Sequence, residues 1–412
     1  MKNFLVHNDE VKKEMLDSVG VSDIEDLFKQ IPSIVRAASL ELENPLSEME
    51  TQKRVKSLAK KNNIEYTTFL GAGVYNKFIP ACISQVASRF EFLTAYTPYQ
   101  PEISQGTLQV MYEFQTMICR LTGMDVSNAT VYDGATACAE AVLMAVRISK
   151  KDKVLVSENL NPEYIKVVKT YCWAGNIEVQ MFDKLPENNS DFACVLIQNP
   201  DFYGEITTIP TVNTLLVVCT DISSLALIEP PKNADIVVGD IQTLGLPMSF
   251  GGPYAGFIAC KEKYLRQIPG RLAGRTVDAD GNSAYCLTIQ TREQHIKREK
   301  ATSNICSNQA LMGLCATLYL TVMGEKGFKQ ASYLSAKMAH NLSTKLSQKG
   351  IRTLNKQFYN EFVIEVDDAE KFLSELKSNN IIGGLKLDEK RILIATTEMI
   401  TEEDIERYLA CI

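Results

Sequence analysis

Short, almost continuously apolar runs recur along the middle of the chain and are rich in valine and isoleucine. Their starts lie about 20 residues apart, which leaves room for a strand and a helix that crosses back over the sheet. Apolar strands separated by helical spacers are typical of a mostly parallel sheet covered on both faces, so we expect a doubly wound α/β domain. The runs are KVLVS at 153–157, IEVQMF at 177–182, ACVLIQ at 193–198, LLVVCT at 215–220, DIVVG at 235–239 and AGFIAC at 255–260.

Apolar residues at helical spacing flank these runs. An amphipathic helix is expected at 107–122, where Gly123 ends it, and an alanine-rich helix from Asp133-Gly134 to about Ser149. Two long helices follow the last run, and the tail then alternates strand, helix, strand and helix, which predicts a small α+β domain. These later elements are expected at 304–323, 326–348, 361–366, 368–379, 391–396 and 401–410.

The first 65 residues have a different character. Apolar positions are sparse there, Asn44-Pro45 interrupts the pattern, and 50–61 reads as a charged helix. Such a segment can bury little by itself, so we expect it to wrap either its own body or a partner. The predicted organisation is a helical N-terminal arm at 1–65, a large α/β domain at 66–325 and a small domain at 326–412.

Composition narrows the classes of function. The chain has 412 residues, a net charge of −7 and a pI near 5.3, which gives no electrostatic case for binding nucleic acid or an anionic membrane. The eleven cysteines form no CxxC pair and the three histidines neighbour no likely ligand set, so no metal site is expected. The N-terminus lacks the apolar core of a signal peptide and no run could span a membrane, which predicts a cytoplasmic protein with reduced thiols.

Ligands of open α/β sheets bind at the carboxyl ends of the strands, so the residues that follow each strand are the candidates for chemistry. The stretch VYDGATACAEA at 131–141 contains a turn at a helix start, where the N–H groups of Gly134 and Ala135 could bind an anion, although many helices start this way without a ligand. Asp221 ends a buried strand, where a carboxylate can pair with a ring nitrogen or cap the next turn.

The third candidate is GDIQTLGLPMSFGGPYAGFIA at 239–259. In pyridoxal-phosphate enzymes with the aspartate aminotransferase fold, the lysine that forms the imine lies in this loop. The stretch 233–260 contains no lysine, and the flanking Lys232 and Lys261 look like surface residues. The fold's ingredients are therefore present without its nucleophile.

Two long blocks carry a family resemblance. TAYTPYQPEISQGTLQVMYEFQTMICRLTGMDVSNA at 94–129 and LTIQTREQHIKREKATSNICSNQAL at 287–311 closely resemble the P protein of the glycine cleavage system, and the likeness covers nearly the whole chain. That family occurs as one long chain with two homologous halves or as two subunits, and this chain resembles the N-terminal half. The resemblance implies a fold type I, aspartate aminotransferase-like large domain.

The resemblance also implies how the enzyme divides its chemistry. Alignment on Gly251-Gly252-Pro253 puts Gln242 where the second half has its lysine, and an amide cannot form an imine. The pyridoxal phosphate should then be held by the second subunit, leaving Gly134, Ala135, Asp221 and Gln242 as vestigial positions. The family decarboxylates glycine and passes the aminomethyl group to the lipoyl group of H protein. We therefore expect a heterodimer, dimerised again.

Active sites of this fold lie between subunits, and we expect this chain to contribute hydroxyl, amide and carboxylate groups from 94–106. A purely cementing role of that segment at the interface stays open. The expected residues are Tyr96, Thr97, Tyr99, Gln100, Glu102 and Gln105.

The charged run at 292–300 is either a solvated helix face or a surface beside the cofactor or H protein. Arg391 precedes the last strand, where relatives of this fold often bind a substrate carboxylate. Two other functions remain open: a self-sufficient pyridoxal-phosphate enzyme that uses Lys232 or Lys261, and a structural or regulatory subunit that docks the lipoyl carrier. The charged residues of the run are Arg292, Glu293, His295, Lys297, Arg298 and Lys300.

Overall fold

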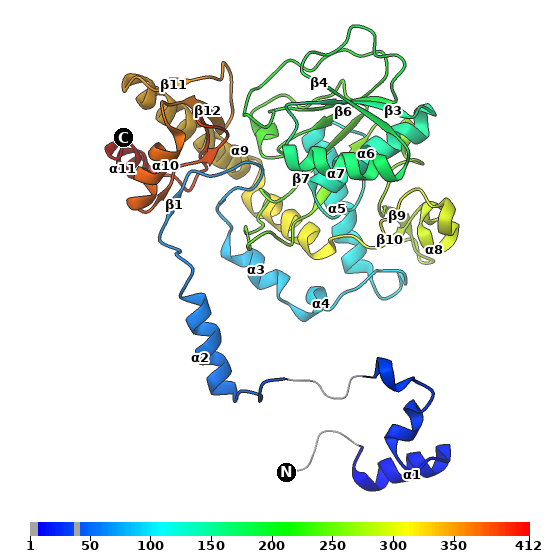
Figure 1. Cartoon of the computed structure of the whole chain (residues 1–412). Coiled ribbons are helices and arrows are strands. Elements are labelled where there is room, and N and C mark those ends of the chain that lie inside the picture. Colours follow the sequence, from blue (N-terminus) through cyan, green and yellow to red (C-terminus); the bar gives the residue numbers. More distant parts are fainter. Residues whose placement is uncertain (1–6, 37–41) are drawn as a thin grey trace. The chain divides into compact units, whose positions relative to one another are not determined.

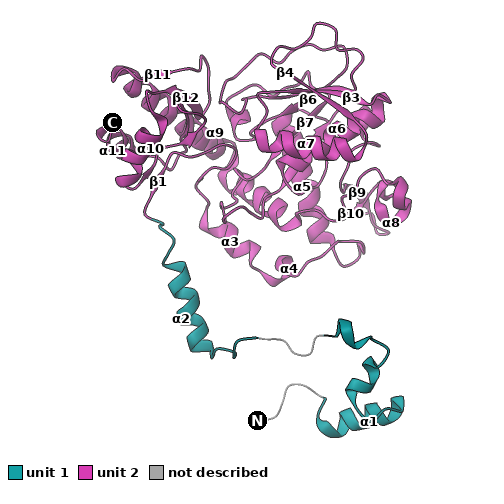
Figure 2. Cartoon of the chain, viewed as in Figure 1, with its two compact units in different colours: residues 1–64 teal, residues 65–412 magenta. Residues whose placement is uncertain are grey.

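The computed structural model describes residues 7–36 and 42–412. The chain divides into two compact units, Met1–Ile64 and Glu65–Ile412, which are coloured separately in Figure 2.

The first unit consists of short helices whose described residues bury no side chain. Its helix ends are nevertheless well specified, because Asp23 with Asp26 and Ser47 with Glu50 form capping boxes. The sequence of this unit therefore specifies the ends of its helices, although its described residues form no buried core. The elements are α1 (Asp9–Val19), η1 (Ile24–Phe28), η2 (Ser33–Val35) and α2 (Glu48–Ala59).

The second unit is built on a seven-stranded sheet with the order β2-β8-β7-β6-β5-β3-β4. The five strands from β7 to β4 are parallel, and β8 and β2 are antiparallel to their neighbours. All six apolar runs of the sequence form strands of this sheet, as the pattern predicts. The strands are β2 (Val126–Ser127), β3 (Lys153–Ser157), β4 (Glu178–Phe182), β5 (Cys194–Gln198), β6 (Leu215–Cys219), β7 (Ile236–Asp240) and β8 (Gly256–Cys260).

Helices cover both faces of this sheet (Figure 1). Alternate residues of one strand enter different cores: Val195 packs in the cluster that contains Phe114 of α5 and Tyr319 of α9, and Leu196 packs in the cluster under α6 and α7. The prediction of a sheet apolar on both faces is confirmed. The helices are α3 (Ala81–Ala87), α4 (Phe90–Leu93), α5 (Gln105–Thr122), α6 (Gly134–Ser149), α7 (Pro162–Ala174) and α9 (Ala310–Gln348).

Most of the crossover helices expected between these strands are absent. Only α7, between β3 and β4, is an α-helical crossover, whereas the connections 183–193 and 199–214 contain no helix and the connection from β6 to β7 holds only the short η3 (Ser224–Ala226). The prediction of a helix in each spacer was wrong. Cover on that face comes instead from α5 and α9, which belong to other parts of the sequence.

The helix α9 leads from the large sheet into the C-terminal domain. Two helices were expected at 304–323 and 326–348; they are joined in one 39-residue element that begins at Ala310 and has non-helical backbone at Gly324 (φ 60°). The domain's antiparallel sheet has the order β11-β12-β15-β14, and α9, α10 and α11 pack on its core. Its elements are β11 (Arg352–Thr353), β12 (Glu361–Glu365), α10 (Ala369–Ser378), β13 (Ile381–Ile382), β14 (Leu385–Lys386), β15 (Arg391–Ala395) and α11 (Glu402–Ala410), with β1 (Thr67–Thr68) paired to β13.

A lobe absent from the sequence prediction lies between β8 and α9. The hairpin of β9 and β10 packs beside α5, and the charged run 292–300 is broken into short turns rather than one solvated helix. The interpretation of 292–300 as a single helix face was therefore wrong. The elements are η4 (Glu262–Tyr264), β9 (Ala273–Val277), β10 (Ser283–Leu287), η5 (Gln290–Arg292), α8 (Gln294–Lys297) and η6 (Arg298–Lys300).

Candidate functional site

A small cavity lies at the carboxyl ends of β5, β6 and β7, where this class of sheet binds ligands. Its volume is about 40 Å³, and it brings together the vestigial positions Asp221 and Gln242 that the sequence singles out. The other polar residues of its lining come from the loop 71–77, from α7 and from strand ends: Gly73, Tyr75, Asn161, Tyr164, Gln198, Thr220, Asp240 and Thr243.

The carboxamide of Gln242 joins two backbone segments. Its Nε2 donates to the carbonyl oxygens of Tyr75 (2.9 Å) and Leu246 (2.8 Å), and its Oε1 accepts from the Tyr75 N–H at 2.9 Å. The side chain is only 1% exposed. An amide suits this position because it donates and accepts at once, which a lysine ammonium cannot do.

The N-terminus of α6 already holds an anion supplied by the chain. Asp240 Oδ2 accepts from the Gly134 N–H at 3.0 Å, and Asp240 Oδ1 accepts from the Gln242 N–H at 2.7 Å. The N-cap Asp133 accepts from the Thr136 N–H. Burial raises the pKa of Asp240 to about 7, against the lowering effect of these N–H donors. The anion site suggested by Gly134 and Ala135 is thus satisfied by a carboxylate from β7.

Asp221 is occupied in the way that the cap interpretation of the sequence describes. Its carboxylate accepts from the Ser223 N–H at 3.0 Å, from the Ser223 hydroxyl and from the Thr243 hydroxyl. These donors turn the chain after β6. The carboxylate still lines the cavity, together with Asp240.

Pyridoxal phosphate does not fit these residues. The volume of the cavity is about 40 Å³, whereas pockets that bind ligands of the size of pyridoxal phosphate are typically at least about 300 Å³. The α6 N-terminus that would receive a phosphate is filled by the carboxyl group of Asp240. The position of the imine-forming amine is taken by Gln242. Size, charge and nucleophile all disagree with the cofactor.

The two lysines considered from the sequence lie away from this cavity. Lys232 has an exposed side chain near Glu229, and Lys261 pairs with Asp235 at 3.2 Å. Neither lines the cavity at the strand ends. The prediction that Lys232 lies at the surface is confirmed, and Lys261 is half-buried beside its partner.

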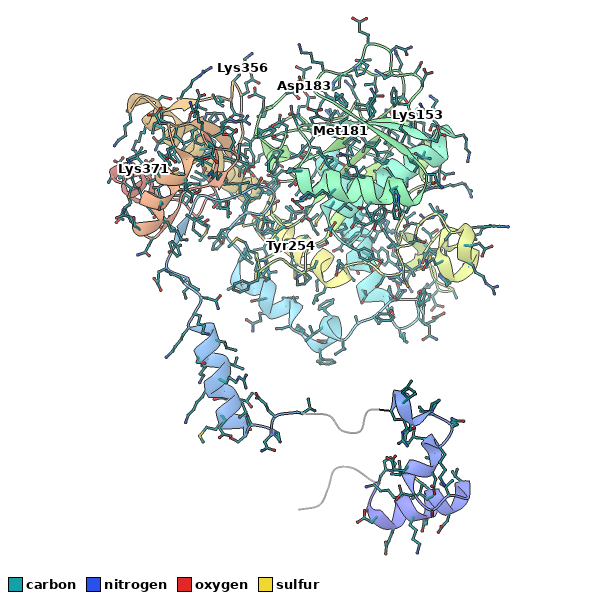
Figure 3. The ribbon with its side chains drawn as sticks, viewed as in Figure 1. Lys153, Met181, Asp183, Tyr254, Lys356 and Lys371 are labelled. Atoms are coloured by element: carbon teal, nitrogen blue, oxygen red, sulfur yellow. The ribbon has the colours of Figure 1, made fainter. Side chains whose placement is uncertain are left out.

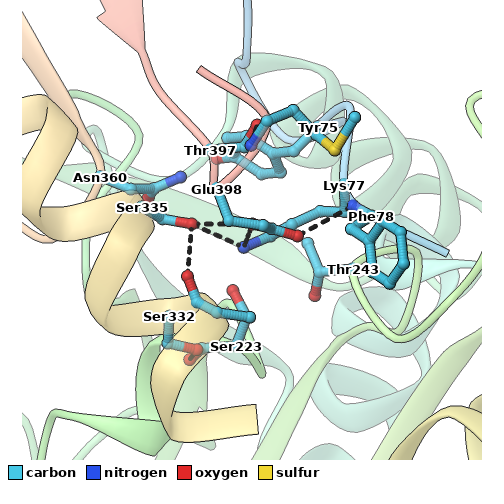
Figure 4. Close-up of polar contacts among 12 residues, drawn as sticks. Tyr75, Lys77, Phe78, Ser223, Thr243, Ser332, Ser335, Asn360, Thr397 and Glu398 are labelled. Atoms are coloured by element: carbon cyan, nitrogen blue, oxygen red, sulfur yellow. Dashed lines mark hydrogen bonds and ion pairs between the residues drawn. The ribbon is translucent and has the colours of Figure 1, made fainter. Parts of the chain in front are cut away.

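A buried lysine that the sequence analysis overlooked, Lys77, lies in the same unit (Figure 4). Its Nζ contacts Glu398 Oε2 at 3.0 Å and Ser335 Oγ at 3.1 Å. Burial opposes its charge, but Tyr359 and Glu398 outweigh burial and raise the pKa of Lys77. An amine held protonated is no nucleophile, so Lys77 is an internal ion-pair partner.

The segment 94–106 runs from the end of α4 through an irregular stretch and a turn at 101–103 into the start of α5. Tyr96, Gln100 and Glu102 are exposed, and Tyr99 is 46% exposed. Gln105 is used inside the chain, since its amide exchanges hydrogen bonds with the backbone of Tyr285. The hydroxyl of Thr97 is buried and has no hydrogen-bond partner among the described residues.

The charged run separates into a buried residue and exposed ones. Arg292 donates to the carbonyl oxygens of Ile289, Ile268 and Gly270 and lies in the interior, where it holds the chain before β9. The ring of His295 meets the ring of Tyr99 edge-on, with centroids 5.5 Å apart.

The two sequence blocks thus meet in space. Lys297, Arg298 and Lys300 are exposed. Arg391 is also exposed and pairs with Asp388 at 2.6 Å.

The loop after β7 projects an aromatic side chain. Phe250 is 96% exposed and has a left-handed backbone (φ 55°), and the Tyr254 hydroxyl, labelled in Figure 3, donates to the Met248 carbonyl oxygen. A bulky apolar residue held outward in an unfavourable conformation is typical of a contact surface.

No group of three His, Cys, Asp or Glu side chains in residues 7–36 and 42–412 could hold a metal ion. Over the same ranges, no helix combines the length and the apolar character that crossing a bilayer demands.

Comparisons with known proteins agree over the full length. Residues 2–412 match the family described as glycine cleavage system P-protein. The chain is 45% identical to a probable glycine dehydrogenase (decarboxylating) subunit 1 of Desulforamulus reducens, covering 99% of this chain and 98% of the relative. It is 44% identical to the protein of the same description from Thermotoga maritima, with 98% of each covered.

Solved structures give the same result. A crystal structure of glycine decarboxylase (P-protein) of the glycine cleavage system, in inhibitor-bound form, superposes with a TM-score of 0.90 at 38% identity over all of both chains. An aspartate aminotransferase of Thermus thermophilus superposes with a TM-score of 0.54 at 11% identity, covering 84% of this chain and 99% of that one, which is a likeness of fold alone.

Proposed function

Since the chain belongs to the glycine cleavage system P-protein family, we propose that it supplies the half of a shared decarboxylation site that carries no cofactor. It is a subunit 1 of glycine dehydrogenase (decarboxylating), the description borne by relatives that it matches from end to end. Its large domain has the fold type I architecture of pyridoxal-phosphate-dependent transferases.

One observation carries the proposal: the amide of Gln242. Both of its polar atoms are used in binding the backbone of Tyr75 and Leu246, so the position is committed to structure. Asp240 fills the neighbouring helix terminus in the same way. Glycine decarboxylases depend on pyridoxal phosphate, and we infer that the second subunit holds it. When bound there, the cofactor withdraws electrons from the amino acid.

This chain's own contribution is a surface that closes the partner's site. The turn 96–102 offers exposed hydroxyl, amide and carboxylate groups from Tyr96, Tyr99, Gln100 and Glu102. Such groups can orient a small amino acid and exclude water. Gln105 holds the turn from within, through hydrogen bonds to the backbone of Pro101 and Tyr285.

The proposed partners of this chain are the second subunit and H protein. Phe90, Tyr96, Ile103 and Phe250 are large apolar side chains left exposed on the second unit, as expected of a surface that another subunit covers. We propose a heterodimer with the second subunit, dimerised again, and transfer of the aminomethyl group to the lipoyl group of H protein.

The test is reduction with borohydride in the presence of pyridoxal phosphate and without glycine, so that the imine formed with a lysine is the one reduced. We expect the labelled lysine peptide to come from the second subunit alone, and we expect glycine–CO₂ exchange only when both subunits are mixed. A labelled peptide from this chain, containing Lys232, Lys261 or Lys77, would contradict the proposal.

A Gln242→Lys variant sharpens the test. The new amine would face Asp240 in a cavity of about 40 Å³, so we expect it to remain unlabelled and to lower stability by about 2–4 kcal/mol through the lost amide contacts. Gln180→Lys, an exposed position on β4, is the matched control and should leave stability unchanged.

A further inference from the structure

Arg271 is a buried cation that no sequence motif singled out. It lies between Gly270 and the start of β9 and is only 3% exposed. Its Nη2 donates to the Cys306 carbonyl oxygen at 2.6 Å, and its Nη1 donates to Asn308 Oδ1 at 3.3 Å. Asn308 in turn donates to the Ala129 carbonyl oxygen at 2.6 Å. The guanidinium is thereby anchored on the chain that leads into α9.

The same guanidinium reaches Tyr99. Its Nη2 donates to the Tyr99 hydroxyl at 3.4 Å, and its Cζ lies 5.6 Å from the centre of the Tyr99 ring. His295 packs against the ring edge-on. Tyr99 is therefore held by its hydroxyl and by its ring, although nearly half of its surface is open.

The arrangement is not optimised for ion pairing. Arg271 Nε has no hydrogen-bond partner among the described residues, and the carboxylate nearest to it, Glu293 Oε2, lies 3.9 Å away. Glu293 Oε1 is likewise buried without a partner, and a cavity of about 10 Å³ separates these groups from Thr302 and Ser303. Buried polar atoms left unpaired are costly, so the position of the guanidinium is set by its other contacts.

Those contacts have a chemical consequence at the Tyr99 oxygen. A phenol oxygen that accepts from a guanidinium keeps its own proton free to donate elsewhere. Nearly half of Tyr99 is exposed and therefore available to whatever covers this surface. The planar guanidinium group of Arg271 donates to several acceptors at once. The ammonium group of a lysine does not reproduce this geometry.

We propose that Arg271 is a positioning residue for the reaction: it fixes Tyr99 so that its hydroxyl donates to an acceptor on the amino acid substrate or on the partner's cofactor. The inference rests on the proposed function, because it requires that 96–102 closes the shared site. Arg271 itself touches neither substrate nor cofactor.

The test compares Arg271→Lys, Tyr99→Phe and the double variant in the reconstituted complex. Arg271→Lys keeps the charge and loses the fork, so we expect kcat for glycine–CO₂ exchange to fall by about tenfold or more. Heterodimer affinity should stay within about twofold of the parent, which separates positioning from assembly.

Coupling decides whether Arg271 acts through Tyr99. In the Tyr99→Phe background, Arg271→Lys should cost less than about threefold in kcat, because the hydroxyl that it orients is gone. Equal losses in both backgrounds would overturn the proposal. Tyr99→Phe removes one exposed hydroxyl and should fold normally, so a parental kcat in that variant would overturn it as well.

Two controls separate the other outcomes. Arg275→Lys, on the exposed part of β9, should leave kcat unchanged, and Arg292→Lys should lower stability, because Arg292 binds only backbone carbonyl oxygens. If Tyr99→Ala and Glu102→Ala both leave exchange and assembly unchanged, the proposed function itself fails. If those variants lose activity and Arg271→Lys does not, only the role of Arg271 fails.

Discussion

Glu361 illustrates how a single buried carboxyl group couples this fold to pH. Its Oε1 accepts from the Ala72 N–H at 2.6 Å, and its Oε2 accepts from the Tyr75 hydroxyl at 2.8 Å. Burial raises the pKa of Glu361 to about 7 against these two donors, and the carboxylates of Asp221 and Asp201 raise it further. The folded chain therefore binds a proton that the unfolded chain releases near its ordinary pKa of 4.5.

The sign of the pH dependence follows. A raised carboxyl pKa adds stability that is complete below the unfolded pKa and is lost as pH rises through the folded value, here from about 4.5 to about 7. Glu361→Gln keeps the contacts of Oε1 and lets Tyr75 reverse its hydroxyl. Relative to this variant, the parent should lose up to about 1.4 kcal/mol per pH unit over that window.

Urea unfolding of both proteins at several pH values measures this difference. Glu365→Gln, exposed at the end of the same strand, is the matched control and should follow the parent. Parallel stability curves for the parent and Glu361→Gln would contradict the assignment of the proton to Glu361.

At the scale of single residues, the sequence identified which residues follow the strands, but it did not identify the side chains and backbone groups that they bind. The missing lysine is read directly from 233–260, and Asp221 follows from the end of an apolar strand, whereas the place of Gln242 came from the family resemblance through Gly251-Gly252-Pro253. Asp240 lies in the candidate stretch 239–259, but its hydrogen bond to the α6 N-terminus joins residues that are 106 positions apart in the sequence. Lys77, Glu361 and Arg271 depend on contacts between distant segments and leave no local signal.

Besides α9, the segment 71–78 connects the large domain to the C-terminal one through side-chain contacts. Gln242 binds the backbone of Tyr75 from the large domain, while Glu398 binds Lys77 and the Phe78 N–H from the segment that precedes α11. Ser335 of α9 completes the contact, as Figure 4 shows. A stretch without a helix or strand at these positions thus derives its structure from side chains on both domains.

Lys77→Met should be strongly destabilising. It leaves the Glu398 carboxylate, 6% exposed, without its cation, and removing one partner of a buried pair costs about 3–5 kcal/mol. Replacing both residues, as in Lys77→Met with Glu398→Leu, should recover much of the loss. Lys345→Met, which breaks an ion pair with Glu406 at the surface, should have little effect.

Urea unfolding of the isolated chain provides the measurement. A Lys77→Met variant as stable as Lys345→Met would show that the buried pair does not hold the two domains through this segment.

The elements themselves were predicted with uneven success. Strands β3 to β8 and helices α5 and α6 were found because continuous apolar runs and helical periodicity are local properties. The spacers at 183–193 and 199–214 were misjudged since their length alone suggested helices, although distant α5 and α9 supply the cover. The run 292–300 was misjudged because Arg292, a charged residue, is buried against carbonyl oxygens.

At the scale of the whole molecule, the unit Met1–Ile64 presents apolar side chains without burying any that the structure describes. Ile34 is 91% exposed, and Phe28, Val35 and Met49 are exposed as well. Its capped helices are specified locally, but they gain no apolar burial of their own. Since exposed apolar surface of this extent is typical of interaction sites, we expect the second subunit to cover this arm.

Deleting residues 1–64 should then affect assembly rather than folding. Because the buried clusters of the second unit consist of its own residues, the thermal midpoint of the remaining chain should change by less than about 2 °C, whereas the heterodimer should weaken by about 100-fold, or about 2.8 kcal/mol. Calorimetry and titration of the two subunits measure these quantities. Ile34→Asp should reproduce part of the weakening in the full chain, and the matched Lys53→Gln should not. A deletion variant that unfolds would show that the arm belongs to the core of this chain. A deletion variant that assembles normally would show that the second subunit does not cover the arm.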